Sequence, residues 1–188
     1  MYIPEPSDTN VRYVSGTPTG IRYGILLGLI NIIVFTVLYI SPIGIFQWWT
    51  GILALVLLIV GLLVALLSMR KQLGGYLTFK QGMQVVVWTI VVSSAINTVY
   101  NYLLYNYIDP SLSEQLKVYS MEFTQKTMVW AGAPQEEIDK TLDQLDKQDY
   151  SLSAASMIKQ FFWWCLFELG IGAVLALIAR RNPPEIKL

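Results

Sequence analysis

One stretch of 21 residues without a charged side chain, from Trp49 to Met69, constrains the fold more than any other feature of the sequence. A helix rises about 1.5 Å per residue, so a stretch of this length spans the hydrocarbon core of a bilayer, which is roughly 30 Å thick. Three further apolar stretches flank it. With 54% hydrophobic and only 14% charged residues, the chain is too apolar for an ordinary soluble domain and is predicted to be an integral membrane protein.

The four stretches predict an all-α fold, an integral membrane four-helix bundle with an extracytoplasmic helical hairpin inserted between spans three and four. Charged residues, glycine and proline end the apolar stretches and so set the expected boundaries. The expected organisation is a cytoplasmic tail at 1–20, spans one to three within 21–107, the extracytoplasmic insertion at 108–158, span four at 159–180 and a second cytoplasmic tail at 181–188.

Basic residues close to the membrane orient the chain. They flank the start of span one, separate spans two and three, and follow span four, whereas the connection between spans one and two has none. An excess of lysine and arginine is typical of cytoplasmic connections. We therefore expect both termini in the cytoplasm and the long insertion on the opposite side of the membrane.

Local signals predict where two of the spans begin. Thr17 is the expected N-cap of span one, with Pro18 at the first helical position. Thr78 and Gln81 form a capping-box pattern at the start of span three, in which each side chain accepts from the backbone N–H of the other residue.

The insertion is acidic and predicted to be helical. Nine of the thirteen acidic residues lie between Asp109 and Asp149. Ser111 with Glu114 forms a capping-box pattern at the start of a first helix, and Pro134 begins a second. The second helix is expected to carry two ion pairs at i,i+4 spacing, Glu136 with Lys140 and Asp143 with Lys147. Two interpretations stay open, a self-packed hairpin that caps the bundle and a docking surface for an envelope partner.

Glu168 is the one acidic residue within a predicted span, where a carboxylate is costly and marks a functional or paired group. Without a cationic neighbour at that depth, we expect it to be protonated and to donate a hydrogen bond. Comparable depth predicts a buried cluster of Asn31, Asn97 and Glu168, in which an amide oxygen accepts the carboxyl hydrogen. Such a cluster either holds helices together or belongs to a path for protons or solutes.

Small residues at helical spacing predict close helix contacts. Gly20, Gly24 and Gly28 share a face of span one, and Gly172 and Ala176 share a face of span four with Glu168. These stripes are expected to face other helices of the bundle or a second copy of the chain.

Several motifs together resemble a known family. They are Tyr23, Gly24 and Gly28 at the start of span one, the glycine-rich stretch 74–82, and Asp109-Pro110 after span three. With these residues the chain resembles small bacterial membrane proteins described as a domain of unknown function, DUF4199-like. The resemblance implies four spans with a helical insertion and a plasma membrane location, which is the inner membrane in a two-membrane bacterium. It implies no activity and no catalytic residues.

The composition favours a protein that is not an enzyme. Histidine is absent, the serines Ser93 and Ser94 have no base within a span, and neither a metal motif nor a cofactor motif occurs. We expect no nucleic-acid partner, because topology explains the basic residues.

The favoured function is a membrane module that presents the acidic hairpin to an envelope protein. The alternative is a small transporter or channel subunit that uses Glu168. The expected partners are the lipid bilayer, an envelope protein and a second copy of the chain.

Overall fold

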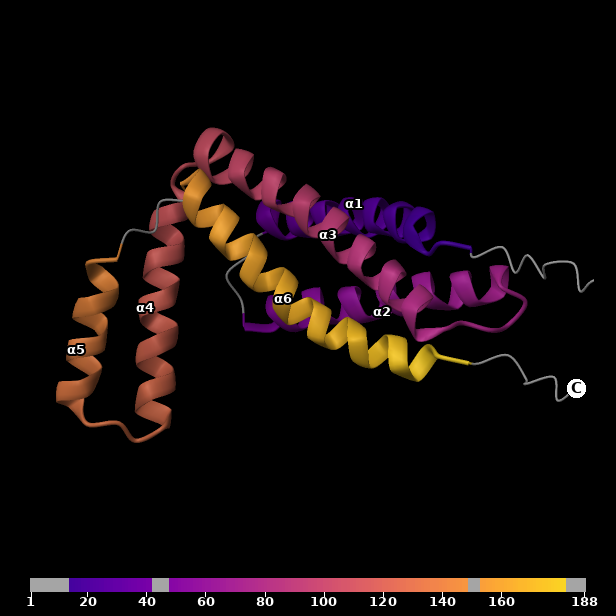
Figure 1. Ribbon diagram of the computed structural model, residues 1–188. Coiled ribbons are helices and arrows are strands. Elements are labelled where there is room, and N and C mark those ends of the chain that lie inside the picture. The colour runs from indigo at the N-terminus through magenta and orange to yellow at the C-terminus, as the bar shows by residue number, and fades with distance from the viewer. Residues whose placement is uncertain (1–13, 42–47, 149–152, 182–188) are drawn as a thin grey trace, which may run out of the picture.

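A computed structural model describes residues 14–41, 48–148 and 153–181, and all regular elements within these ranges are helical (Figure 1). Four helices are long and apolar enough to cross a membrane. They are α1 (Thr17–Ile40), α2 (Trp48–Gln72), α3 (Phe79–Leu103), which continues through the π-helical turn η1 (Leu104–Ile108), and α6 (Ala154–Ala179). The predicted all-α fold with four membrane spans is therefore confirmed, and the chain is a multi-pass membrane protein.

Helix α3 is the centre of the bundle. It packs against α1 on one side and α6 on another, while α2 contacts α1, α3 and α6 (Figure 1). The largest fully buried side chains of this bundle belong to α2, α3 and the turn between them, with Leu62, Leu66, Leu77 and Ile90 among them. These buried apolar side chains pack tightly the half of the bundle that lies next to the turn between α2 and α3.

The connection between α2 and α3 closes one end of the bundle, which we call the turn end (residues 70–79). Gly74 and Gly75 have φ angles of +69° and +95°, a conformation that glycine adopts without steric cost. Leu77 then pairs with Arg181 beyond α6 through two backbone hydrogen bonds of 2.9 and 3.0 Å. The predicted capping box of Thr78 and Gln81 is confirmed at the start of α3.

The insertion contains two helices, α4 (Leu112–Trp130) and α5 (Gln135–Asp146), which pack against each other. Ile138 of α5 is only 2% exposed, and the Lys117 ammonium of α4 lies 3.0 Å from the Asp146 carboxylate of α5. In Figure 1 the pair extends crosswise from the bundle, and α4 lies between α5 and the spanning helices. We call the end of the bundle from which α4 starts the hairpin end.

Two predicted caps are wrong. Thr17 is the first residue of α1, not its N-cap, and its backbone N–H donates to the Ser15 hydroxyl at 3.2 Å. Ser111 precedes α4 but accepts no capping bond; its hydroxyl and its N–H both donate to Asp109 Oδ1, at 2.6 and 3.1 Å. The reason is that the Asp109 carboxylate takes the Ser111 N–H that the Glu114 carboxylate would accept in a capping box, and the Glu114 N–H donates to the Ser111 carbonyl at 3.1 Å instead of to its hydroxyl.

Two further details differ from the sequence prediction. Helix α6 begins at Ala154, capped by the Ser153 hydroxyl, because a helix can continue through polar residues beyond the apolar stretch from which a span at 159–180 was predicted.

The predicted pairs Glu136 with Lys140 and Asp143 with Lys147 do not form among the described residues. Ion pairs form instead at Lys117 with Asp146 and at Lys126 with Glu122. Most of both predicted tails, residues 1–13 and 182–188, lies outside the described residues.

Candidate functional site

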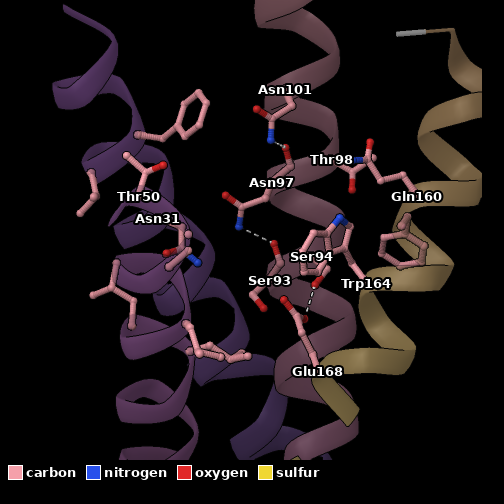
Figure 2. A pocket seen from close by; sticks show the side chains of 18 of the residues that line it. Asn31, Thr50, Ser93, Ser94, Asn97, Thr98, Asn101, Gln160, Trp164 and Glu168 are labelled. Atoms are coloured by element: carbon pink, nitrogen blue, oxygen red, sulfur yellow. Dashed lines mark hydrogen bonds between the residues drawn. The ribbon is translucent and has the colours of Figure 1, made fainter. Parts of the chain in front are cut away.

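A cavity of about 650 Å³ occupies the half of the bundle next to the hairpin end (Figure 2). Residues from α1, α2, α3 and α6 line it, together with Leu116 of α4. Leu58 of α2 and Ser93 of α3 line the cavity, whereas Leu62 and Ile90, about one turn closer to the turn end, are fully buried. The cavity therefore ends at the packed half of the bundle.

The α3 wall of the cavity is polar. Helical spacing brings one row of hydroxyl and amide side chains to this wall, namely Ser93, Ser94, Asn97, Thr98 and Asn101. Glu168 of α6 lies opposite, and the Ser94 hydroxyl donates to Glu168 Oε2 at 3.0 Å (Figure 2). Among the described residues, this one hydrogen bond holds the half-buried carboxyl group against α3. It uses Oε2, so Oε1 is left for another partner.

The amides on α3 use their N–H groups within the helix. Asn97 Nδ2 donates to the Ser93 carbonyl at 2.8 Å, and Asn101 Nδ2 donates to the Asn97 carbonyl at 2.9 Å. A carbonyl only accepts, so these bonds fix which amide atom is nitrogen. Figure 2 shows both amide oxygens on the side that faces away from α6. The α3 wall therefore offers hydrogen-bond acceptors to the cavity.

The three residues of the predicted polar cluster, Asn31, Asn97 and Glu168, all line this cavity. No hydrogen bond joins any two of them within the described part of the chain. The partner of the Glu168 carboxyl is Ser94, not an amide oxygen as predicted, because the Asn97 amide oxygen faces away from α6 (Figure 2). The sequence also places Ser94 in a polar stripe of span three with Asn97 and Asn101, but Ser94 was not predicted as the partner of Glu168. Its position three residues before Asn97 was the signal that places it on the same face.

The glycines of α1 contact α3 of the same chain. A Cβ atom on Gly24 would lie 2.8 Å from Val92 Cβ and 2.9 Å from the Thr89 carbonyl oxygen, and Gly20 is similarly close to Val85 and Trp88. Gly28 faces Ile96 at about 3.1 Å. Gly16 continues this pattern toward the turn end, and sequence reasoning did not include it.

This contact carries a hydrogen bond and has a counterpart on α6. The Thr89 hydroxyl donates to the Gly20 carbonyl at 3.2 Å, which the close approach of the two helices makes feasible. On α6, Gly172 lies against Val86, and Ala176 is fully buried beside Gly82. These small residues pack against other helices of the same chain, so they are not available for contact with a second copy. Binding of a second copy stays a prediction.

A second cluster fixes the base of the hairpin. Leu104, Tyr105 and Leu112 are buried together next to the end of α1. Asp109 follows η1 and accepts from the Tyr39 hydroxyl at 3.1 Å. The Ser111 hydroxyl beside it holds the pKa of the Asp109 carboxyl below its usual value; partial burial opposes this effect, and the Tyr39 bond adds to it.

Comparison with known proteins places the chain in a family without assigning it an activity. Residues 22–181 match the family described as protein of unknown function (DUF4199). No curated protein and no solved structure matches the chain.

Proposed function

We propose that this chain, which belongs to the DUF4199 family of proteins of unknown function, is a non-enzymatic interaction module of a bacterial plasma (inner) membrane. In this proposal the four-helix bundle anchors the protein. The α4–α5 hairpin is presented to an envelope partner on the extracytoplasmic side.

The observation that carries the proposal is the charge and position of α5. Its twelve residues include five acids and one lysine, and all six of these side chains are exposed. Ile138 of this helix is buried, and among the described residues only one of the five acids, Asp146, forms an ion pair with α4, so the other four do not hold the hairpin together. Because α4 lies between α5 and the bundle (Figure 1), the acidic side chains are available to another molecule.

The distribution of basic residues supports an extracytoplasmic hairpin. The start of α1, the α2–α3 connection and the end of α6 lie at the same end of the bundle (Figure 1). This end carries Arg22, Arg70, Lys71, Lys80 and Arg180. By the positive-inside rule the turn end faces the cytoplasm, which puts α4 and α5 on the other side.

An acidic helical surface favours a partner with a basic surface. Complementary charges steer association and orient the partners, and their effect is screened by salt. We therefore expect the complex to weaken as ionic strength rises.

Photo-crosslinking tests the proposal. A photoreactive residue replaces the exposed Gln144 of α5, and crosslinks are formed in native membranes. We expect one specific adduct that fades when Glu136, Glu137, Asp139 and Asp143 are replaced by their amides. The matched control carries Glu114→Gln and Glu122→Gln on α4, which also removes exposed acids. An adduct that survives in the α5 variant, or is lost equally in the control, would contradict the proposal.

A transporter or channel subunit that uses Glu168 is the second candidate, and the cavity is the observation in its favour. The fully buried side chains at the turn end argue against an open path through one chain. Proton flux into liposomes tests this function: flux through the intact protein that is lost with Glu168→Gln supports it, and flux unchanged by the substitution removes it.

A further inference from the structure

One apolar stripe runs along the whole length of α4, and we call it the α4 stripe. Its members are spaced by four, three, four and seven residues, namely Leu112, Leu116, Tyr119, Phe123 and Trp130. A helix has about 3.6 residues per turn, so this spacing keeps all of them on one face. Trp130 follows Leu112 by about five full turns, and the two side chains therefore leave the helix in the same direction.

Among the described residues, the protein covers only the first part of the α4 stripe. Leu112 is 2% exposed and is buried against the end of the third span, where Leu116 also packs. Further along the same face, Phe123 is 51% exposed and Trp130 is 88% exposed. The α4 stripe thus begins as part of the bundle and continues as an exposed apolar surface.

The spans fix where this surface lies relative to the membrane. Helix α1 has 24 residues, and at a length of about 36 Å it slightly exceeds the hydrocarbon core of roughly 30 Å, so its ends reach the two interfaces. Tyr39 lies next to the last residue of α1, and its hydroxyl donates to Asp109. Because α4 begins three residues after Asp109, it starts at the level of the interface.

The direction of α4 turns its stripe toward lipid. The helix runs crosswise to the spans, and hence along the membrane surface (Figure 1). It also lies between α5 and the spans (Figure 1). Since Leu112 at the start of the stripe faces the spans, Phe123 and Trp130 face the bilayer that surrounds them.

The charges of the hairpin agree with this orientation. Lys117 of α4, which pairs with Asp146 of α5, lies about 140° around the helix from Leu112. The acidic helix α5 is therefore on the side of α4 away from the stripe, where anionic headgroups repel it least. Lys126 is the charged residue nearest the stripe, and its ammonium lies 3.2 Å from Glu122. A lysine stem can cover apolar surface while its ammonium stays among polar groups.

We propose that α4 lies in the headgroup region of the leaflet at the hairpin end, with phospholipid against the α4 stripe and Trp130 as its anchor. Amphipathic helices that lie along a membrane bury their apolar face in this region. Tryptophan is typical of it, because the ring is apolar and the indole N–H can bond to polar groups. The proposal holds whether or not a partner binds α5, so it does not rest on the proposed function.

Spin-label accessibility in vesicles tests this placement. The full chain with Cys165→Ala is reconstituted in phosphatidylcholine and carries one nitroxide, at Phe123→Cys on the stripe or at Gln125→Cys as the control. Gln125 is exposed and points to nearly the opposite side of α4. Collisions with oxygen, which concentrates in lipid, are compared with collisions with a water-soluble nickel chelate. We expect oxygen to dominate at position 123 and the nickel chelate to dominate at position 125.

A second pair of variants tests the anchor, with the label kept at position 123. Trp130→Ser removes the exposed ring, so we expect nickel collisions at position 123 to rise toward those at position 125. Val129→Ser is the control, because Val129 is also exposed, at 59%, but lies about 100° around the helix from Trp130. It should leave the collisions unchanged. Phosphatidylglycerol or added salt should also leave them unchanged, because apolar burial requires no charge.

The other outcomes contradict the proposal. Nickel collisions as frequent at position 123 as at position 125 mean that the α4 stripe faces water. Low accessibility to both reagents means that protein covers the stripe, and spin–spin broadening then identifies a second copy. Protection that requires phosphatidylglycerol and disappears in salt assigns the contact to charge. Equal effects of Trp130→Ser and Val129→Ser exclude Trp130 as the anchor. None of these results depends on the crosslink from α5, so the two proposals can fail separately.

Discussion

The Tyr39 hydroxyl donates a hydrogen bond of 3.1 Å to the carboxylate of Asp109, and this bond joins the end of the first span to the start of the hairpin. The two residues are 70 positions apart in the sequence. Asp109 also accepts both donors of Ser111, so one carboxylate holds α1 and organises the first turn before α4. The orientation of the hairpin on the bundle depends on this group.

The hairpin base should weaken in acid. The pKa of Asp109 is lowered in the folded protein, first of all by the Ser111 hydroxyl. Its contribution is therefore complete above the unfolded-state pKa of about 3.9 and is lost as pH falls through the lower folded-state value. We expect amide hydrogen exchange at the start of α4, corrected for the intrinsic rate, to accelerate below about pH 4. Asp109→Asn should remove most of this dependence, and an equally steep response in that variant would count against the assignment.

The contact between α1 and α3 should not tolerate a side chain at Gly24. A new Cβ would lie within 3 Å of Val92 and of the Thr89 carbonyl, so the helices must separate. We expect Gly24→Ala to destabilise the protein by about 1–3 kcal/mol, as overpacking does, measured as thermal unfolding in detergent. Gly170→Ala on α6 is the control, because a Cβ there meets nothing within 4 Å. Equal stability of the two variants would show that α1 and α3 do not pack this closely.

The hydrogen bond between Thr89 and Gly20 should make a small but measurable contribution. Thr89 is fully buried, and Thr89→Val keeps its shape while removing the donor. We expect a loss of about 0.6 kcal/mol, and at most about 1.7 kcal/mol, which is the range for hydrogen bonds between membrane helices. The control is Thr127→Val on the exposed surface of α4, where the hydroxyl bonds only within its own helix. An equally large loss of stability in the control would show that the interhelical hydrogen bond contributes no more than one within a single helix.

Labelling of single cysteines should place the hairpin outside the cytoplasm. In a chain with Cys165→Ala, we expect a membrane-impermeant maleimide to label Gln144→Cys in intact cells. Gln72→Cys, exposed at the turn end, should react only after the membrane is permeabilised. Labelling of both positions from the same side would contradict the proposed orientation.

Local chemistry made much of this fold predictable. The spans follow from apolar stretches, and the capping box of Thr78 and Gln81 depends on residues three positions apart. The caps of α1 and α4 were predicted wrongly: α1 begins one residue earlier than expected, at Thr17, and the Asp109 carboxylate takes the Ser111 N–H that Glu114 would accept in a capping box. A short pattern does not rank such competing acceptors.

The candidate site was only partly predictable. Depth along each span brings Asn31, Asn97 and Glu168 to one cavity, but the bond from Ser94 to Glu168 depends on how α6 is rotated and shifted against α3. That register is set by nonlocal packing, in which Gly172 lies against Val86 and Ala176 lies beside Gly82. No pattern within one helix encodes such a contact.

The backbone pairing of Leu77 with Arg181 limits how the last span can move. Two hydrogen bonds tie the end of α6 to the turn before α3, so sliding of one helix along the other would break both of them. Tilting of α6 preserves them, with this tie as the pivot. Such a tilt would widen the bundle around Glu168 and leave the opposite end sealed, so that an occupant could enter and leave through one side only.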